Sequence, residues 1–256
     1  MISMAIEIFN RYEHKYKMDT ETFHKVLEVM DQHMELDKHC QNHSFYTIAN
    51  IYYDTPDNEL IRRSLSKPVY KEKMRLRAYG VPDMETKVFL EIKKKYNGLV
   101  NKRRTTLKLN EAYDFTASGK APEIKDYMNS QVVRELEYFM HNYDLKPAVY
   151  IAYDRLAYFE KGNDDLRISF DTNIRTRRYD VALESGDYGE KLLDNDTWLM
   201  EIKTSMAKPL WLCKMLSDLG LKKTSFSKYG TEYKNMLIKN RHKKYFFTVK
   251  PLRKAV

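Results

Sequence analysis

Cysteine, glycine and proline are all scarce in this sequence of 256 residues. The two cysteines, Cys40 and Cys213, provide neither a disulfide framework nor a thiolate zinc site, so a reducing cytoplasm is the expected compartment. Eight glycines and seven prolines leave little room for linkers or low-complexity segments. We therefore predict a single domain over residues 1–240, followed by a basic tail over residues 241–256.

Long apolar runs and glycine-rich loops are also missing. No stretch approaches the roughly 20 apolar residues of a membrane span, and residues 1–10 lack the pattern of a signal peptide. The sequence contains no Gly-x-x-x-x-Gly-Lys or Gly-x-Gly-x-x-Gly loop, and no Ser/His/Asp arrangement stands out. Neither a glycine-loop nucleotide site nor a nucleophilic triad is therefore predicted.

Positive charge, by contrast, is in excess. The 45 Lys and Arg residues outnumber the 36 Asp and Glu residues, which gives a net charge of +9. This balance predicts an anionic partner: nucleic acid, a membrane surface or a phosphorylated small molecule. The basic tail could contact the inner surface of a membrane peripherally, although a solvated chain end is the simpler interpretation. A specific nucleic-acid partner is not expected, because the other cations alternate with apolar residues inside strands.

The stretch Lys71–Tyr79 shows this alternation most clearly. A strand has a period of 2, so Lys71, Lys73, Arg75 and Arg77 fall on one face and apolar residues fall on the other. Like charges about 7 Å apart along a strand repel each other. A solvated outer face is one interpretation of this single strand.

Four further stretches repeat the pattern, each mixing Lys or Arg with a carboxylate: 11–16, 89–93, 166–171 and 199–203. Solvated strand faces usually also contain Thr, Ser and Gln, which are rare here. We therefore predict an α+β fold in which one closed or nearly closed antiparallel sheet forms a β-barrel tunnel with a charged interior. Helices would pack on the outside against the apolar faces.

The remaining elements follow from periodicity and turn signals. Leu60–Leu65 is either a helical turn or a short strand, with Arg62 and Arg63 facing the interior. Further strands are expected over 46–53, 100–109 and 148–159, and helices over 20–38, 112–120, 131–143, 209–219 and 225–237.

The charged faces define a candidate site for an anion. The predicted inward cations are Lys15, Arg75, Arg77, Lys93, Arg155, Arg167, Lys203 and Lys228, against the carboxylates Glu13, Glu91, Asp171 and Glu201. A partly desolvated cavity with this excess of cations needs water, counter-ions or an anion to fill it. Arginine binds phosphate oxygens in a bidentate manner, and carboxylates suit a hard divalent cation held beside phosphates. The site therefore predicts triphosphate or polyphosphate binding with Mg²⁺ or Mn²⁺.

Eight short motifs, spread from Arg11 to about Tyr233, resemble the VTC-domain (vacuolar transporter chaperone) proteins. The motifs are RYEHKY at 11–16, YDTP at 53–56, KMRLRAYG at 73–80, LEIK at 90–93, YDR at 153–155, RISFD at 167–171, EIK at 201–203 and FSKY at 226–229. This family is a branch of the triphosphate tunnel metalloenzymes, and its catalytic member is a polyphosphate polymerase. The resemblance implies the same antiparallel tunnel with helices outside.

The resemblance also implies roles for individual residues. Glu201 would ligate the divalent metal, and we assign Glu91 and Glu13 to the same metal. The predicted catalytic cations are Lys15, Arg75, Arg77, Lys93, Lys203 and Lys228, and the predicted phosphate-binding residues are Arg63, Lys73, Arg155, Arg167 and Ser227. ATP and polyphosphate are the implied ligands, and a separate membrane protein is a possible partner for export.

Two positions depart from the family pattern. Arg11 replaces the first Glu of the wider superfamily, as is usual in the polymerase branch, and Ser225 stands where catalytic members often have Lys. We predict a metal-dependent enzyme that transfers the γ-phosphate of ATP to polyphosphate and releases ADP. The alternatives are a tunnel-type triphosphatase or nucleotide cyclase, and a catalytically silent tunnel that binds polyphosphate or inositol phosphates. Taken singly, Arg155 with Asp171, or Glu201 with Lys203, could be an ordinary structural pair.

Overall fold

A computed structural model of the chain describes residues 12–37, 40, 44–97 and 99–248. Its strands are β1 (Tyr12–Met18), β2 (Met34–Leu36), β3 (Tyr46–Asp54), β4 (Tyr70–Tyr79), β5 (Lys87–Tyr96), β6 (Leu99–Lys108), β7 (Lys146–Glu160), β8 (Asn163–Arg177), β9 (Glu190–Lys191), β10 (Trp198–Thr204) and β11 (Lys223–Thr224). Its helices are α1 (Thr20–Met30), α2 (Glu59–Leu65), α3 (Leu109–Ser118), α4 (Ser130–Asn142), α5 (Leu210–Asp218) and α6 (Lys228–Thr248).

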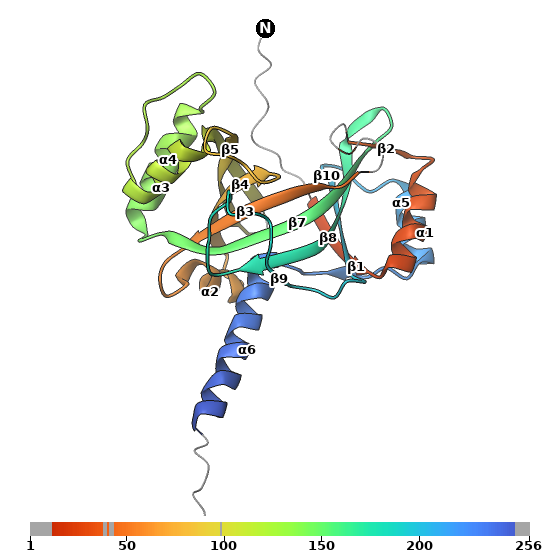
Figure 1. The fold of residues 1–256 in the computed structure, drawn as a ribbon. Helices are drawn as coiled ribbons and strands as arrows, with labels where there is room; N and C mark the ends of the chain where they lie inside the picture. The colour runs from red at the N-terminus through yellow and green to blue at the C-terminus, as the bar shows by residue number, and fades with distance from the viewer. Residues whose placement is uncertain (1–11, 38–39, 41–43, 98, 249–256) are drawn as a thin grey trace, which may run out of the picture.

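The strands form one antiparallel sheet, and the α+β prediction is confirmed. The order across the sheet is β11-β1-β10-β8-β7-β3-β4-β5-β6, with β2 added to β7 and β9 added to β8. The sheet is strongly curved, and helices lie at both of its ends (Figure 1). One of its faces carries the residues predicted to point inward, because Arg75 lies opposite both Tyr52 and Glu91 in the register. We call this the inner face.

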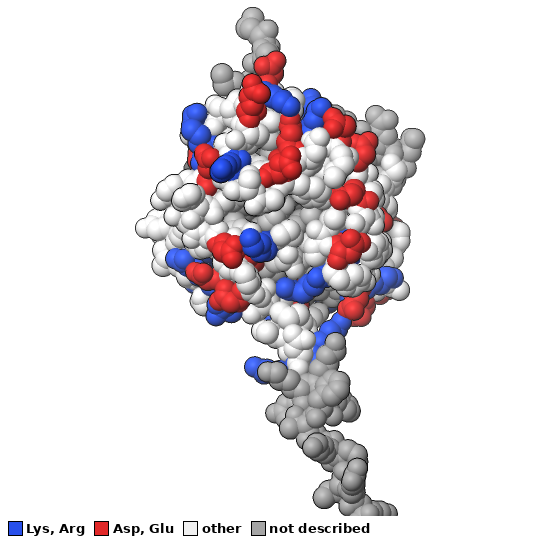
Figure 2. Space-filling view, turned by 60° about the vertical axis from the view of Figure 1, so that its left-hand side comes forward, with Lys and Arg blue, Asp and Glu red and all other residues white. Residues whose placement is uncertain are grey.

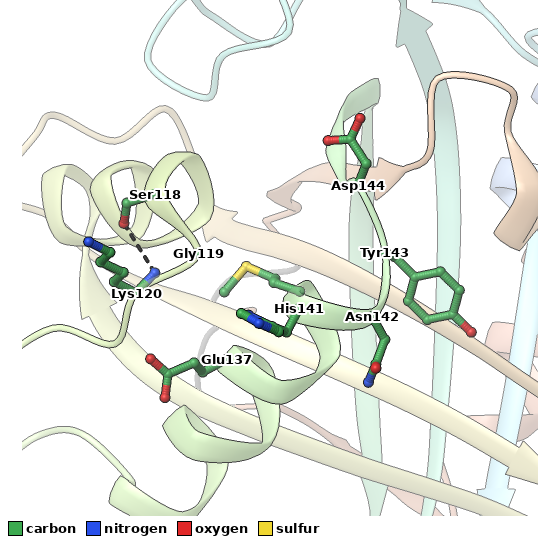
Figure 3. A pocket seen from close by; sticks show the side chains of 9 residues that line it. Ser118, Gly119, Lys120, Glu137, His141, Asn142, Tyr143 and Asp144 are labelled. Atoms are coloured by element: carbon green, nitrogen blue, oxygen red, sulfur yellow. Dashed lines mark hydrogen bonds between the residues drawn. The ribbon is translucent and has the colours of Figure 1, made fainter.

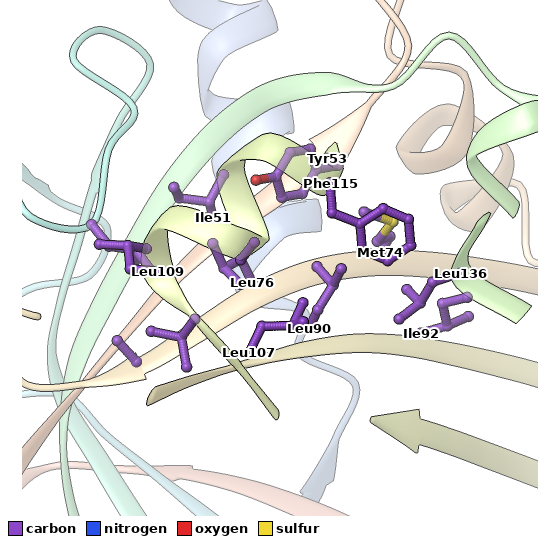
Figure 4. Close-up of a cluster of buried hydrophobic side chains, with 14 of the residues drawn as sticks. Ile51, Tyr53, Met74, Leu76, Leu90, Ile92, Leu107, Leu109, Phe115 and Leu136 are labelled. Atoms are coloured by element: carbon purple, nitrogen blue, oxygen red, sulfur yellow. The ribbon is translucent and has the colours of Figure 1, made fainter. Parts of the chain in front are cut away.

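Two separate apolar cores cover the outer face. On one side α3 and α4 pack on β3 to β6, where Phe115 and Leu136 meet Met74, Leu76 and other buried side chains (Figure 4). On the other side α1 and α5 pack on β1, β7, β8 and β10. The apolar alternate residues of each strand therefore face these helices, as the period of 2 predicts.

The prediction that helices pack only on the outside is wrong for α2 and the start of α6. Ile61 of α2 and Tyr229 and Tyr233 of α6 belong to a third buried cluster, which includes Ile48 of β3 and Ile151 of β7. Both strand residues lie on the inner face, because the register places Ile151 opposite Asn50, and Asn50 opposite Arg77. The inner face is thus partly apolar, and burying this apolar part requires a cover.

The predicted closure of the barrel is also wrong. Among the described residues, no backbone ladder joins β6 to β1 or β11. One cause is that β11 already occupies part of the free edge of β1, where Lys15 and Tyr16 pair with Thr224 and Lys223. Side chains bridge the interior instead, because the Lys93 Nζ of β5 lies 3.7 Å from a Glu13 oxygen of β1.

Several predicted elements change their ends. The first helix stops at Met30 and not near residue 38, because residues 34–36 pair with the long strand β7. Leu60–Leu65 belongs to a helix, which resolves the alternative left open by its sequence. The two-residue strands β9 and β11 were not predicted, since two residues cannot display a period.

The last helix, α6, extends away from the body of the molecule (Figure 1). It continues to Thr248, so the predicted boundary at residue 240 falls within a helix. Residues 249–256 of the basic tail lie outside the described part. Within the part of the chain that the structure describes, no helix is both long enough and apolar enough to cross a membrane.

Candidate functional site

The inner face brings most of the predicted site residues together. Antiparallel register places Glu13 opposite Lys203 and Lys15 opposite Glu201, while Lys73 lies opposite Lys93. We call the following side chains the charged cluster: Lys15, Lys73, Arg75, Arg77, Lys93, Lys102, Arg155, Lys203, Lys228, Glu13, Glu91, Asp171 and Glu201. Nine of these residues are cations and four are carboxylates, so positive charge is in excess.

Glu201 lies at the centre of one half of the charged cluster. Its carboxylate oxygens are 3.0 Å from Lys15 Nζ and 3.3 Å from Lys203 Nζ, and both Arg155 and Lys228 approach to 3.9 Å. Burial opposes ionisation of Glu201, but these cations outweigh it and hold the pKa of its carboxyl well below the usual value. Glu201 is therefore an anion that draws cations from β1, β7, β10 and α6 together.

Asp171 is fully buried beside this group. Arg155 donates to both of its carboxylate oxygens, at 2.6 and 2.8 Å, and Lys228 Nζ donates to one of them at 2.5 Å. The structural pairing of Arg155 with Asp171 that the sequence left open is therefore present. Burial of Asp171 is outweighed by these two cations, so the pKa of its carboxyl is lowered. This arrangement fixes the orientation of the Arg155 guanidinium.

The two arginines of β4 are held differently from each other. Arg75 donates through Nε to Glu91 at 2.6 Å, and Lys102 Nζ lies 2.6 Å from the other oxygen of Glu91. Arg77 has polar, uncharged partners, because it donates to Asn50 at 3.0 Å and to the Tyr153 hydroxyl at 3.2 Å. These contacts orient Arg77 and leave its charge uncompensated by them, as binding of an anion requires.

The start of α6 lies below the curved sheet in Figure 1, and its first residue, Lys228, contacts Asp171 of the charged cluster. Ser227 caps this helix, because its Oγ accepts a hydrogen bond from Gly230 N–H at 3.2 Å. The same oxygen lies 3.3 Å from Lys73 Nζ, which donates to it. Ser227 therefore lies beside Lys73 of β4, and Lys228 shares Asp171 of β8 with Arg155 of β7. Contact of either residue with phosphate stays a prediction.

The pKa values of the lysines reflect the excess of positive charge. Burial lowers the pKa of Lys73 to about 8, and the nearby Lys93, Lys71 and Lys15 contribute to the decrease. Burial also lowers the pKa of Lys102 to about 7; Glu91 opposes this, whereas Arg75 and Arg77 reinforce it. An anion bound among these lysines would favour their protonated forms.

The same cations favour the charged form of Glu13. Its burial and its proximity to Glu201 both raise the pKa of its carboxyl, but Lys93, Lys203 and Lys15 outweigh them and lower it to about 2. Glu13 therefore stays ionised at neutral pH and carries negative charge to the open side of the sheet, where Lys93 of β5 reaches it across the interior.

Two predicted phosphate-binding residues lie away from the charged cluster. Arg167 is on the inner face, but its guanidinium donates to Asp37 at 3.0 Å and lies over the Phe159 ring. Arg63 is exposed on α2, and its charge acts on Tyr70 and Tyr143, which bind Glu72 on the other face of β4. Binding of phosphate by these two residues stays a prediction.

The three predicted metal ligands do not form one group. Within the described ranges, no three His, Cys, Asp or Glu side chains gather closely enough to hold a metal ion. Glu91 is engaged by Arg75 and Lys102, whereas Glu13 and Glu201 share Lys15. Of the three, Glu201 would be the residue to hold a divalent cation, and phosphate oxygens would have to supply the other ligands, as at many Mg²⁺-dependent phosphoryl-transfer sites.

Two hollows elsewhere on the molecule do not contain the predicted site. One, of about 530 Å³, lies between the ends of α3 and α4, next to Gly119, Glu137 and His141 (Figure 3). The other, of about 510 Å³, includes Arg175, which Asp154 and Asp187 already neutralise. Basic and acidic side chains are interspersed on the face shown in Figure 2, without a continuous patch of one sign.

Four contributors to the charged cluster were not predicted as site residues. Lys102 lay on a basic strand face in the sequence, and this pattern could have identified it. Asn50, Tyr52 and Tyr153 orient the two arginines of β4, since Arg75 also donates to Tyr52 at 3.3 Å. They were missed because an uncharged residue on a strand gives no signal of which arginine lies opposite.

The comparisons with known proteins agree with the motifs. The VTC domain family matches residues 10–237, so the chain belongs to the VTC domain family, and that prediction is confirmed. The chain is also similar to vacuolar transporter chaperone complex subunit 4 of Trypanosoma brucei brucei, with 31% identity over 162 residues, or 53% of this chain. It spans 20% of the length of that relative.

The solved structures to which the chain is similar are more distant. A putative adenylate cyclase from Bacillus halodurans has a TM-score of 0.47 and 15% identity, with 86% of this chain and 96% of that chain covered. A putative adenylate cyclase from Vibrio parahaemolyticus has a TM-score of 0.44 and 13% identity, with 87% and 97% covered. Both TM-scores lie below 0.5, so the family assignment rests on the sequence match.

Proposed function

We propose that this domain is a metal-dependent polyphosphate polymerase. In this reaction a terminal oxygen of the polyphosphate chain attacks the γ-phosphorus of ATP, the bond between that phosphorus and the β,γ-bridging oxygen breaks, and ADP leaves. Such a transfer needs positioning and neutralisation of charge and no covalent nucleophile. Membership of the VTC domain family supports a polyphosphate-related role.

The observation that carries this proposal is the half-buried excess of cations on the inner face. Nine cationic side chains and four carboxylates lie together, and Arg77 donates its hydrogen bonds to Asn50 and Tyr153, which are both uncharged. Removing cations from water without an equal number of anions is unfavourable, so the arrangement favours a bound polyanion. A linear phosphate chain provides several negative charges along one line, which suits Lys73, Arg75 and Arg77, the cations that follow one another on the inner face of β4.

Different residues of the charged cluster would bind the phosphates and the metal. Arg75, Arg77 and Arg155 would bind phosphate oxygens, since their guanidinium planes are fixed by Glu91, Asn50 and Asp171 respectively. Lys15, Lys203 and Lys228 would exchange part of their contact with Glu201 for contact with phosphate. Glu201 would then be available to hold Mn²⁺ or Mg²⁺, which neutralises charge that develops on the transferred group.

The experiment is incubation of the pure protein with ATP and Mn²⁺ or Mg²⁺, with products separated on a polyphosphate gel and ADP quantified. The proposal predicts a phosphate ladder that depends on the metal and is lost in Glu201→Gln and in Arg77→Gln. Lys94→Gln is the control, because Lys94 lies on the outer face opposite Glu72. Free phosphate or a cyclic nucleotide as product would instead identify a triphosphatase or a cyclase.

A silent phosphate-binding tunnel is the second candidate. Ser225 favours it, because catalytic members of the family often have Lys at this position. Tight binding of tripolyphosphate without turnover in either metal would identify it. If Ser225→Lys then gained polymerase activity, the absence of a lysine at position 225 would be the reason why the wild-type protein is inactive. A membrane-protein partner that exports the product stays a prediction.

A further inference from the structure

The inner face of β4, β5 and β6 changes in character along its length. Successive rows across these strands are Arg77–Phe89–Thr106, Arg75–Glu91–Arg104, Lys73–Lys93–Lys102 and Lys71–Lys95–Val100. The first two rows combine arginine with a carboxylate or an aromatic ring. The last two rows contain five lysines and no acidic residue, and we call these five residues the lysine rows.

Lys71 and Lys95 lie outside the charged cluster, one row further along. They are directly opposite each other on neighbouring strands, and both are half-buried. Like charges in this position destabilise a sheet. Lys71 Nζ makes a long contact of 3.4 Å with the Ser64 carbonyl of α2, which is an uncharged acceptor. The residues opposite Lys95 on its two neighbouring strands are Lys71 and Val100, and neither is acidic.

The outer face of the same two strands provides the contrast. There the neighbouring pair in the register is Glu72 with Lys94, which have opposite charges. Opposite charges thus face each other in this pair on the outer face, whereas like charges face each other in the lysine rows on the inner face. A pair of opposite charges such as Glu72 and Lys94 is common on a solvated strand face. Solvation alone does not explain why the inner row of Lys71 and Lys95 lacks a carboxylate.

The row spacing fits an extended ligand. Successive rows lie about 7 Å apart along the strands, so Lys71 and Lys95 are about 14 Å from the row of Arg75. The apolar cluster of Ile61, Tyr229 and Tyr233 covers another part of the inner face, which restricts the directions in which a long chain can leave the arginines. Burial, together with Lys95 and Lys67, also lowers the pKa of Lys71, as expected for a cation without a counter-charge.

We propose that Lys71 and Lys95 form a distal subsite that holds the phosphates of a polyphosphate chain beyond the three bound at the charged cluster. This inference rests on the proposed function, because it places the growing product along the lysine rows. The ligand class is a linear inorganic polyanion longer than a triphosphate. The subsite would favour long chains over short ones and guide the chain out along β4 and β5.

The test compares two probes, tripolyphosphate and long-chain polyphosphate, by calorimetry without ATP. The wild-type protein is expected to bind the long chain more tightly than tripolyphosphate. The double variant Lys71→Gln/Lys95→Gln should lose roughly tenfold in affinity for the long chain, whereas its affinity for tripolyphosphate should change little. The dependence of the long-chain affinity on salt should also become shallower by roughly 1.5 units of slope, because two cations are removed. Lys94→Gln is the matched control on the other face and should leave both affinities unchanged.

Three outcomes would overturn the distal subsite. The double variant could retain the preference for long chains, it could lose affinity for both probes equally, or a single-stranded oligonucleotide could bind as tightly and lose as much. The first result removes the role of these lysines, the second assigns them to the triphosphate site, and the third makes the rows a general polyanion surface. A wild-type protein that shows the length preference but makes no polymer would contradict the proposed polymerase and leave the subsite supported.

Discussion

Asp171 lies fully buried between two cations, Arg155 and Lys228. Removing its charge would leave both cations without their nearest counter-ion in a poorly solvated position. We predict that Asp171→Asn lowers the free energy of unfolding by about 3 kcal/mol. Urea denaturation measures this change. Glu21→Gln is the control, since Glu21 and Lys25 form an exposed pair, and it should leave the midpoint unchanged. An equal effect of both variants would contradict the central position of Asp171.

The lowered pKa of Lys73 predicts that phosphate binding is coupled to proton uptake. Its pKa is lowered to about 8 in the free protein, mainly by burial, so at pH 9 it is mostly neutral. Phosphate oxygens beside it would raise this pKa, and binding would therefore take up a proton. We expect tripolyphosphate binding at pH 9 to take up about one more proton in the wild type than in Lys73→Arg, whose guanidinium is always charged.

Calorimetry of this binding in two buffers with different ionisation enthalpies measures the uptake. The arginine variant is a suitable control because it keeps the positive charge beside Ser227. If both proteins took up the same number of protons, Lys73 would not lie next to the bound phosphates.

At the residue scale, period-2 alternation was enough to predict which cations share the inner face. Lys15, Arg75, Lys93 and Lys203 were predicted in this way, because the period depends only on local sequence. The partner of each cation could not be predicted, since it depends on the register between distant strands. Arg167 illustrates this, because it has the expected face but binds Asp37.

At the scale of elements, one buried carboxylate connects β3, α2 and α6. Asp54 accepts hydrogen bonds from the backbone of Leu60 and Ile61 at 2.8 and 3.0 Å, and from the Tyr229 hydroxyl at 2.7 Å. The first turn of α6 is thereby held where Lys228 reaches Asp171. The position of one site residue thus depends on a contact outside the charged cluster.

We predict that Tyr229→Phe lowers the free energy of unfolding by about 1.5 kcal/mol, because a hydrogen bond to a buried carboxylate is lost. It should also weaken tripolyphosphate binding, since Ser227 and Lys228 lose part of their support. Thermal unfolding and calorimetry measure the two effects. Tyr179→Phe changes an exposed tyrosine and should do neither. Unchanged stability in Tyr229→Phe would show that Asp54 does not fix α6.

The sequence predicted the type of most elements, and it failed where tertiary contacts decide. Met34 continues the apolar spacing of α1 and is buried in the same core, so periodicity could not show that residues 34–36 form a strand. The inner position of α2 and α6 was missed for a related reason. Ile48 and Ile51 make β3 apolar on both faces, a pattern that could have indicated cover on both sides but not by which helix.

At the scale of the whole molecule, the curved sheet is open at one side and bridged by side chains. Glu13 of β1 contacts both Lys15 and Lys93, so it neutralises cations at this opening. We predict that Glu13→Gln raises the affinity for tripolyphosphate, measured without metal, by roughly three- to tenfold. A decrease in affinity, measured by the same titration on a folded variant, would contradict the role of Glu13 as a competing anion.

Whether the sheet closes into a barrel could not be predicted from the sequence. Strand alternation shows that charged faces converge, but the same alternation is produced by a closed barrel and by an open curved sheet. The difference depends on the short strand β11, which occupies the edge of β1 at Lys15 and Tyr16. Two residues of strand carry no signal that could be read before the fold is known.

The central claim is that the charged cluster binds a triphosphate chain, and calorimetric titration of tripolyphosphate tests it most directly. Arg77→Gln is the decisive variant. Removing this guanidinium leaves only the uncharged Asn50 and Tyr153 without their hydrogen-bond partner, and among the described residues no buried carboxylate loses an ion pair. The claim predicts that the wild type binds, that Arg77→Gln binds at least roughly tenfold more weakly, and that Lys94→Gln binds normally. Absence of binding to the wild type, or equal losses in the inner-face and outer-face variants, would contradict it.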